Sequence, residues 1–165
     1  MRMNMASLVA ALAVAGATLV IASPAGAATA TSGTFGPHGY GGIKLGMTAK
    51  QAKATGKIVL KWRDYCSGWD YKAHRNARHE VGLYISKKRG VAVIFAPAGV
   101  RTPKGIGAGS TLRQIKKAYS GVKEQPSGYY VTAPGNREAD YYFGLNRQGK
   151  VEQLGLVLKT QDCVN

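Results

Sequence analysis

The chain has 165 residues, with 23 Lys and Arg against 8 Asp and Glu, so its formal net charge is +15 at pH 7. Apolar residues make up 45% and charged residues 19%, a composition typical of globular proteins and unlike that of disordered or fibrous chains. Two Cys and three His argue against a dense disulfide scaffold and a zinc site with several ligands. We expect no metal and no cofactor.

Residues 1–27 have the pattern of a secretory signal peptide. Arg2 precedes an uncharged stretch at 5–23 that is rich in Ala, Leu and Val, and small residues follow at 25–27, as a cleavage site requires. A membrane anchor is the alternative interpretation of the apolar stretch. We expect a secreted, extracellular protein without a transmembrane segment after cleavage.

Two segments of the remaining chain resemble each other. Residues 43–53 and 106–116 share Ile, Gly, Thr, Gln and Lys in register, 63 positions apart. Each contains Thr-x-x-Gln, which predicts a capping box at the start of a helix. Glycines follow at 56 and 121, so we predict short helices over 48–56 and 111–120.

Each predicted helix is followed by runs rich in β-branched and aromatic residues, which are typical of strands. These runs are 66–73, 81–86 and 91–96 after the first helix, and 129–133, 140–145 and 151–159 after the second. The predicted fold class is α+β: two tandem repeats, each a helix plus an antiparallel sheet, in a pseudo-symmetric two-layer arrangement. We assign repeat 1 to 41–104 and repeat 2 to 105–165, with 28–40 as a flexible N-terminal segment because it is rich in Gly, Thr and Ser.

Cys66 and Cys163 are the only cysteines. In an exported protein such a pair is expected to form one structural disulfide. A reactive thiol pair is the alternative, but no Cys-x-x-Cys motif supports it.

The helix entries are Leu-Gly-Met-Thr-x-x-Gln-Ala at 45–52 and Gly-Ile-x-x-Gly-Ser-Thr-Leu at 105–112. With the tandem organisation, they resemble the β-lactamase-inhibitory-protein fold. The first entry is also similar to the small lipoprotein subunit of the outer-membrane barrel-assembly machinery. The inhibitor resemblance implies a concave sheet that grips a partner enzyme, with an acidic loop residue entering that enzyme's active site. Asp64 and Asp70 are the only acids in a comparable part of the chain.

Aromatic residues are the main candidates for binding a partner. Helices cover only one face of an antiparallel sheet, so rings on the other face are free to bind. The candidates are Trp69, Tyr71, Tyr84, Tyr130 and Tyr142. The alternative is that these rings fill the core. We predict a non-enzymatic, inhibitor-like binding module that is a monomer and engages a protein partner, which the inhibitor resemblance implies is an enzyme.

Two other functions compete with this prediction. The basic cluster Lys87, Lys88 and Arg89 indicates weak, non-specific binding of polyanions, as expected for a basic cell-surface protein. A small ribonuclease-like hydrolase would use a histidine and a carboxylate as base and acid, with arginines holding phosphate. The candidate residues for that chemistry are His74, Arg75, Arg78, His79 and Glu80, but no catalytic motif contains them.

Overall fold

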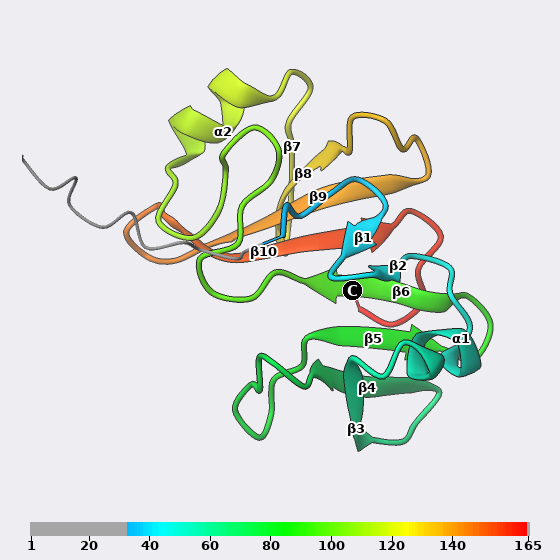
Figure 1. The fold of residues 1–165 in the computed structure, drawn as a ribbon. Helices are drawn as coiled ribbons and strands as arrows, with labels where there is room; N and C mark the ends of the chain where they lie inside the picture. The colour runs from blue at the N-terminus through cyan, green and yellow to red at the C-terminus, as the bar shows by residue number, and fades with distance from the viewer. Residues whose placement is uncertain (1–32, 165) are drawn as a thin grey trace, which may run out of the picture.

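The computed structural model describes residues 33–164, so the predicted signal peptide and residues 28–32 lie outside the described part. The main element of the fold is one antiparallel sheet of eight strands in the order β3-β4-β5-β6-β10-β9-β8-β7 (Figure 1). Its strands are β3 Ile58–Trp62, β4 Cys66–Tyr71, β5 Leu83–Ser86, β6 Gly90–Phe95, β7 Lys123–Gln125, β8 Gly128–Thr132, β9 Ala139–Leu145 and β10 Val151–Leu158. A small hairpin, β1 Gly39–Tyr40 with β2 Ile43–Lys44, packs beside it.

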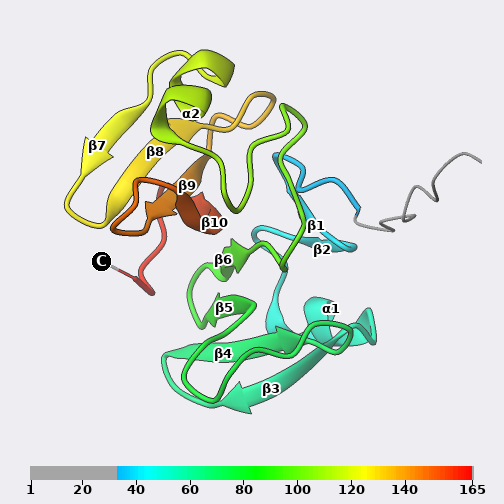
Figure 2. The ribbon, with the colours of Figure 1, turned by 90° about the vertical axis from the view of Figure 1, so that its left-hand side faces the viewer.

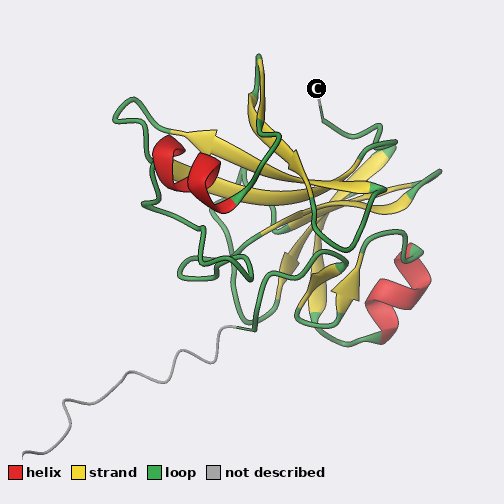
Figure 3. Ribbon diagram, turned by 90° about the horizontal axis from the view of Figure 1, so that it is seen from above, coloured by secondary structure: helices red, strands yellow, loops and turns green. Residues whose placement is uncertain are grey.

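The predicted α+β fold class is wrong. The helices α1 Ala49–Ala54 and α2 Leu112–Ala118 have six and seven residues, and they are small beside the strands (Figure 3). The architecture is therefore mostly antiparallel β rather than a layer of helices on a sheet. The physical reason is that each helix ends within two turns, whereas the chain after it supplies four strands.

The starts of both helices are as predicted. The Thr48 hydroxyl accepts from the Gln51 backbone N–H at 3.2 Å, and the Gln51 side chain accepts from the Thr48 N–H at 2.9 Å. Thr111 and Gln114 repeat this box with distances of 3.3 and 2.8 Å. These bonds satisfy backbone donors that a helix start otherwise leaves free.

We expect Thr48→Ala and Thr111→Ala each to lower the free energy of unfolding by about 0.5–2 kcal/mol, because each removes a cap acceptor. Urea denaturation of the single variants measures the effect. Thr160→Ala, at an exposed position after β10, is the control and should leave the midpoint unchanged. Equal midpoints for all three variants and the wild type would contradict the role of the caps.

The centre of the sheet joins distant parts of the chain. β6 pairs with β10 through Phe95–Gly155, Ile94–Leu156 and Val93–Val157. The strands before α2 and those after it therefore belong to one continuous sheet.

The core lies on the helix side of this sheet. Ala52 of α1, Ile115 of α2 and the neighbouring Tyr119 are buried there against the sheet. Phe35 is also fully buried, and its carbonyl accepts from the Tyr141 hydroxyl at 3.0 Å. The prediction of a flexible segment at 28–40 is thus wrong for residues 33–40, because Phe35 and Tyr40 anchor them to the core.

Cys66 and Cys163 form the predicted disulfide, with an S–S distance of 2.01 Å and a sequence separation of 97. Among the helices that the structure describes, none has the length and apolar character needed to cross a membrane.

Candidate functional site

The sheet has two different sides. The core side carries both helices and the β1–β2 hairpin, and the other side, here called the open face, carries the C-terminal segment (Figure 2). Strand alternation places neighbouring residues on opposite sides. In β9, for example, Tyr141 and Phe143 are buried in the core, whereas Tyr142 between them is half-buried on the open face.

Two of the five predicted partner-binding rings are on the core side. Trp69 is 6% exposed and Tyr71 is 4% exposed, and both belong to the main core cluster. The Trp69 indole N–H donates to Ser67 Oγ at 2.8 Å, and the Tyr71 hydroxyl donates to the Tyr40 carbonyl at 3.3 Å. The prediction that they form the centre of the binding site is corrected, because both rings point toward the helix side and are covered.

The other three predicted rings lie on the open face together with two rings that the sequence analysis did not select. This row of half-buried rings, here called the aromatic stripe, consists of Trp62, Tyr84, Phe95, Tyr142 and Tyr130. Ring centroids are 6.4 Å apart for Trp62 and Tyr84, 6.3 Å for Tyr84 and Phe95, and 5.1 Å for Tyr142 and Tyr130. The stripe crosses the sheet from β3 to β8.

Two glycines lie beneath the stripe. Gly68 is the cross-strand neighbour of both Trp62 and Tyr84, and a Cβ at this position would collide with the Trp62 ring. Gly155 lies between Phe95 and Tyr142, where a Cβ would be 3.4 and 3.2 Å from the two rings. The missing side chains at these two positions leave room for the neighbouring rings, which meet one another edge to face along β3, β5 and β6.

The β8 end of the stripe is held at the β7–β8 turn. The Tyr142 hydroxyl donates to the Ser127 carbonyl at 3.0 Å, and the Tyr130 hydroxyl is 2.8 Å from Ser127 Oγ. Desolvation and the adjacent Tyr130 raise the pKa of Tyr142 above its ordinary value. Rings held in this way lose little conformational entropy when they bind.

A loop over residues 72–82 borders the stripe at the β4 end, and a buried aspartate holds this loop. The Asp70 side chain is 1% exposed and accepts from Asn76 Nδ2 at 2.7 Å and from the Gly82 N–H at 3.0 Å. Lys61 Nζ lies 3.3 Å from its second oxygen. Burial alone raises the pKa of Asp70, but the bonds from Asn76, Lys61 and Gly82 outweigh it and hold the pKa below its ordinary value. Asp70 is thus structural and cannot be the acidic residue that enters a partner's active site.

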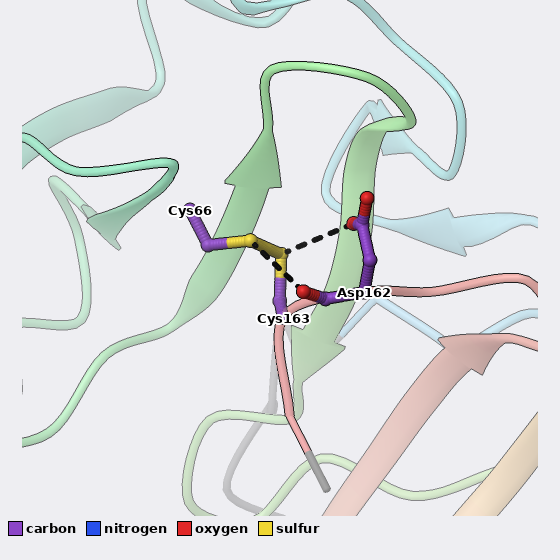
Figure 4. A group of neighbouring side chains, drawn as sticks. All are labelled: Cys66, Asp162 and Cys163. Atoms are coloured by element: carbon purple, nitrogen blue, oxygen red, sulfur yellow. Dashed lines mark hydrogen bonds between the residues drawn. A yellow bond between two sulfur atoms is a disulfide. The ribbon is translucent and has the colours of Figure 1, made fainter.

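The C-terminal segment borders the stripe on the other side. Cys163 and Val164 pack against Val93 and Val157 on the open face, and the disulfide ties them to β4. Asp162 lies beside the two sulfur atoms (Figure 4) and accepts from the Tyr65 hydroxyl at 2.8 Å. The group of Cys66, Asp162 and Cys163 has metal-ligand spacing, but both thiols are consumed by the disulfide, which excludes thiolate ligation there.

The residues considered for hydrolase chemistry are all exposed on the 72–82 loop. Arg75, Arg78 and His79 surround a hollow with Trp62 and Lys61. Glu80 instead lines a different groove, at the ends of β6 and β9. The structure therefore does not gather His79 and Glu80 into one pocket.

Another basic hollow lies on the helix side. Lys87, at the β5–β6 turn, lines it together with Lys50, Lys53 and Arg63, and its volume is about 550 Å³. Asp64 is its one acidic lining residue. Lys88 and Arg89 are exposed at the same turn, and their backbone N–H groups donate to Ser86 Oγ. The predicted polyanion-binding cluster thus gains three cations from other elements.

Searches with family models, with curated proteins and with solved structures found no significant match to this chain.

Proposed function

We propose that this chain is a secreted, non-enzymatic, inhibitor-like module that binds a protein partner through the aromatic stripe. The observation that supports the proposal is a row of five half-buried rings across the sheet face opposite the helices. Tyrosine and tryptophan on a rigid surface are the residue types that contribute most to protein interfaces. The resemblance to β-lactamase-inhibitory proteins supports an enzyme as the partner.

The test first uses the wild-type protein to capture a partner by affinity from the culture that produces it. Variants with substituted stripe residues are then compared for retention of that partner. The variant is Tyr84→Ser with Tyr142→Ser, and the matched control is Tyr65→Ser, because Tyr65 is 45% exposed and lies outside the stripe. A partner retained by the wild type and the control should be lost by the double variant. With the purified partner, each stripe substitution should weaken Kd by about 30-fold, which corresponds to about 2 kcal/mol.

Thermal melts of the same variants separate binding from folding. The double variant should remain folded, since both rings lie on the open face and neither belongs to the main core cluster. A folded double variant that still retains the partner with unchanged Kd would overturn the proposal. Retention of no protein by the wild type would also count against it.

Binding of a polyanion is the second candidate function, favoured by the four cations around the helix-side hollow. We expect retention on immobilised heparin that falls steeply with salt, since neutralised anionic groups release counterions. Lys53→Gln with Lys87→Gln should elute at lower salt than Lys116→Gln with Lys117→Gln, which removes the same charge from α2. Equal elution of the two variants would exclude a focused site, and retention insensitive to salt would exclude the electrostatic mechanism.

A further inference from the structure

A groove of about 610 Å³ lies at the strand ends next to the aromatic stripe. Two stripe rings, Phe95 and Tyr142, form part of its wall, and the groove is therefore continuous with the open face. Its other walls come from the 72–82 loop, the β7–β8 turn, the end of β9 and the start of β10.

The charge of this groove is opposite to that of the chain. Three of the four glutamates of the sequence line it: Glu80, Glu124 and Glu152. None of its lining residues is Lys, Arg or His, although the chain contains 23 Lys and Arg. All three glutamates are exposed, and neither of the ion pairs found in the described residues involves them. Their carboxylates are therefore available to a ligand.

The groove also offers aromatic surface to a cation. The Tyr142 and Phe95 rings flank Gly155, and Tyr129, which packs against the main core cluster, also lines the groove. Glu124 and Tyr129 are cross-strand neighbours in the β7–β8 pair, and desolvation, followed by the Glu124 carboxylate, raises the pKa of Tyr129. A guanidinium or ammonium group gains both from carboxylates and from the negative faces of aromatic rings.

We propose that this groove receives an arginine or lysine side chain from the protein that binds the aromatic stripe, and this inference rests on the proposed function. Charge complementarity selects the occupant: the carboxylates attract a cation and repel nucleic acid or another polyanion. The rest of the strongly basic surface repels a cationic partner, so the groove is where such a side chain can approach. Arg75 and Arg78, on the same 72–82 loop as Glu80, line a separate hollow beside Trp62.

An NMR titration with a short capped arginine peptide tests the inference. The control peptide carries citrulline, which has the shape of arginine without its charge. We expect the arginine peptide to shift the amide signals of Phe95, Tyr142 and Gly144 at low salt. The citrulline peptide should leave them unchanged.

Two matched variants locate the binding. The double variant Glu124→Gln with Glu152→Gln should bind the arginine peptide with an affinity about fivefold lower than the wild type, because each exposed ion pair contributes modestly to binding. Glu138→Gln, at the fourth and exposed glutamate outside the groove, should leave the affinity unchanged. Equal weakening by Glu138→Gln, equal binding of citrulline, or no shift at the groove would overturn the inference.

The outcomes also separate this inference from the proposed function. Tyr84 does not line the groove, so loss of the partner in a Tyr84→Ser variant supports the stripe whatever the peptide does. If the partner binds the Glu124→Gln, Glu152→Gln variant as tightly as the wild type, the groove is not part of the interface. If those substitutions abolish self-association in sedimentation experiments, the occupant is a second copy of this chain and the assignment to a partner fails.

Discussion

Replacing Cys66 and Cys163 by Ser is expected to lower the free energy of unfolding by about 4–5 kcal/mol in the chain-entropy model, the largest effect we predict. The disulfide joins residues 97 positions apart. Without it, the unfolded chain therefore gains conformational entropy over most of the described residues. Urea denaturation of the oxidised protein and the double variant measures the difference. A free-thiol assay on denatured wild type should find no thiol.

Tyr65→Phe is the matched control for this prediction. It removes the hydrogen bond from the Tyr65 hydroxyl to Asp162 but leaves the disulfide intact, so its effect should be small because both groups are exposed. Two thiols per wild-type chain, or equal stability of the oxidised protein and the double variant, would contradict the prediction.

Asp70→Ala is expected to cost about 3 kcal/mol. The substitution removes the acceptor of hydrogen bonds from Asn76 and Gly82 and leaves the Lys61 ammonium without its buried carboxylate. We expect the 72–82 loop to detach first, which trypsin cleavage after Arg75 or Arg78 reports. Asp64→Asn, at an exposed acid, is the control. Unchanged urea midpoints and unchanged cleavage for Asp70→Ala would show that the loop is held by other contacts.

The same carboxylate gives folding a dependence on pH. Its pKa in the folded state lies below the ordinary value of 3.8. The stabilisation is therefore complete above that value and is lost as the pH falls through the lower, folded-state pKa. Asp70→Asn should lack this part of the acid dependence. Identical acid unfolding of Asp70→Asn and wild type, relative to their stabilities at pH 7, would contradict the assignment.

Local signals in the sequence predict local structure well here. The Thr-x-x-Gln boxes mark both helix starts, and the runs selected as strands correspond to six strands of the sheet. β7 has no such signal because Lys123, Glu124 and Gln125 are all polar and exposed. The fold class was wrong because the helices predicted over 48–56 and 111–120 are each three residues longer than α1 and α2, and because β3 and β7 were not recognised.

The candidate site was predicted only in part, because the sequence does not show the register between strands or the side of the sheet that the helices cover. Alternation shows that Trp69 and Tyr71 share one side of the sheet, but it does not say which side the helices cover or on which side Tyr84 of the next strand lies. Trp62 and Phe95 were missed. The pairing of Gly68 with Trp62, and of Gly155 with Phe95, depends on register between strands, which the sequence alone does not show. The burial of Asp70 depends likewise on a loop returning over the sheet.

The pairing of β6 with β10 has a consequence for the order in which the protein is built. β10 is the last of the described strands along the chain, and it lies at the centre of the sheet between β6 and β9. During synthesis, β3 to β6 are made first. The side of β6 that faces β10 then has no strand partner until β10 itself is made. Pairing over such sequence distances slows folding and leaves apolar edges exposed for longer. Chains truncated before Val151 should therefore aggregate, because β6 then leaves the edge at Val93, Ile94 and Phe95 without the β10 strand that pairs with it.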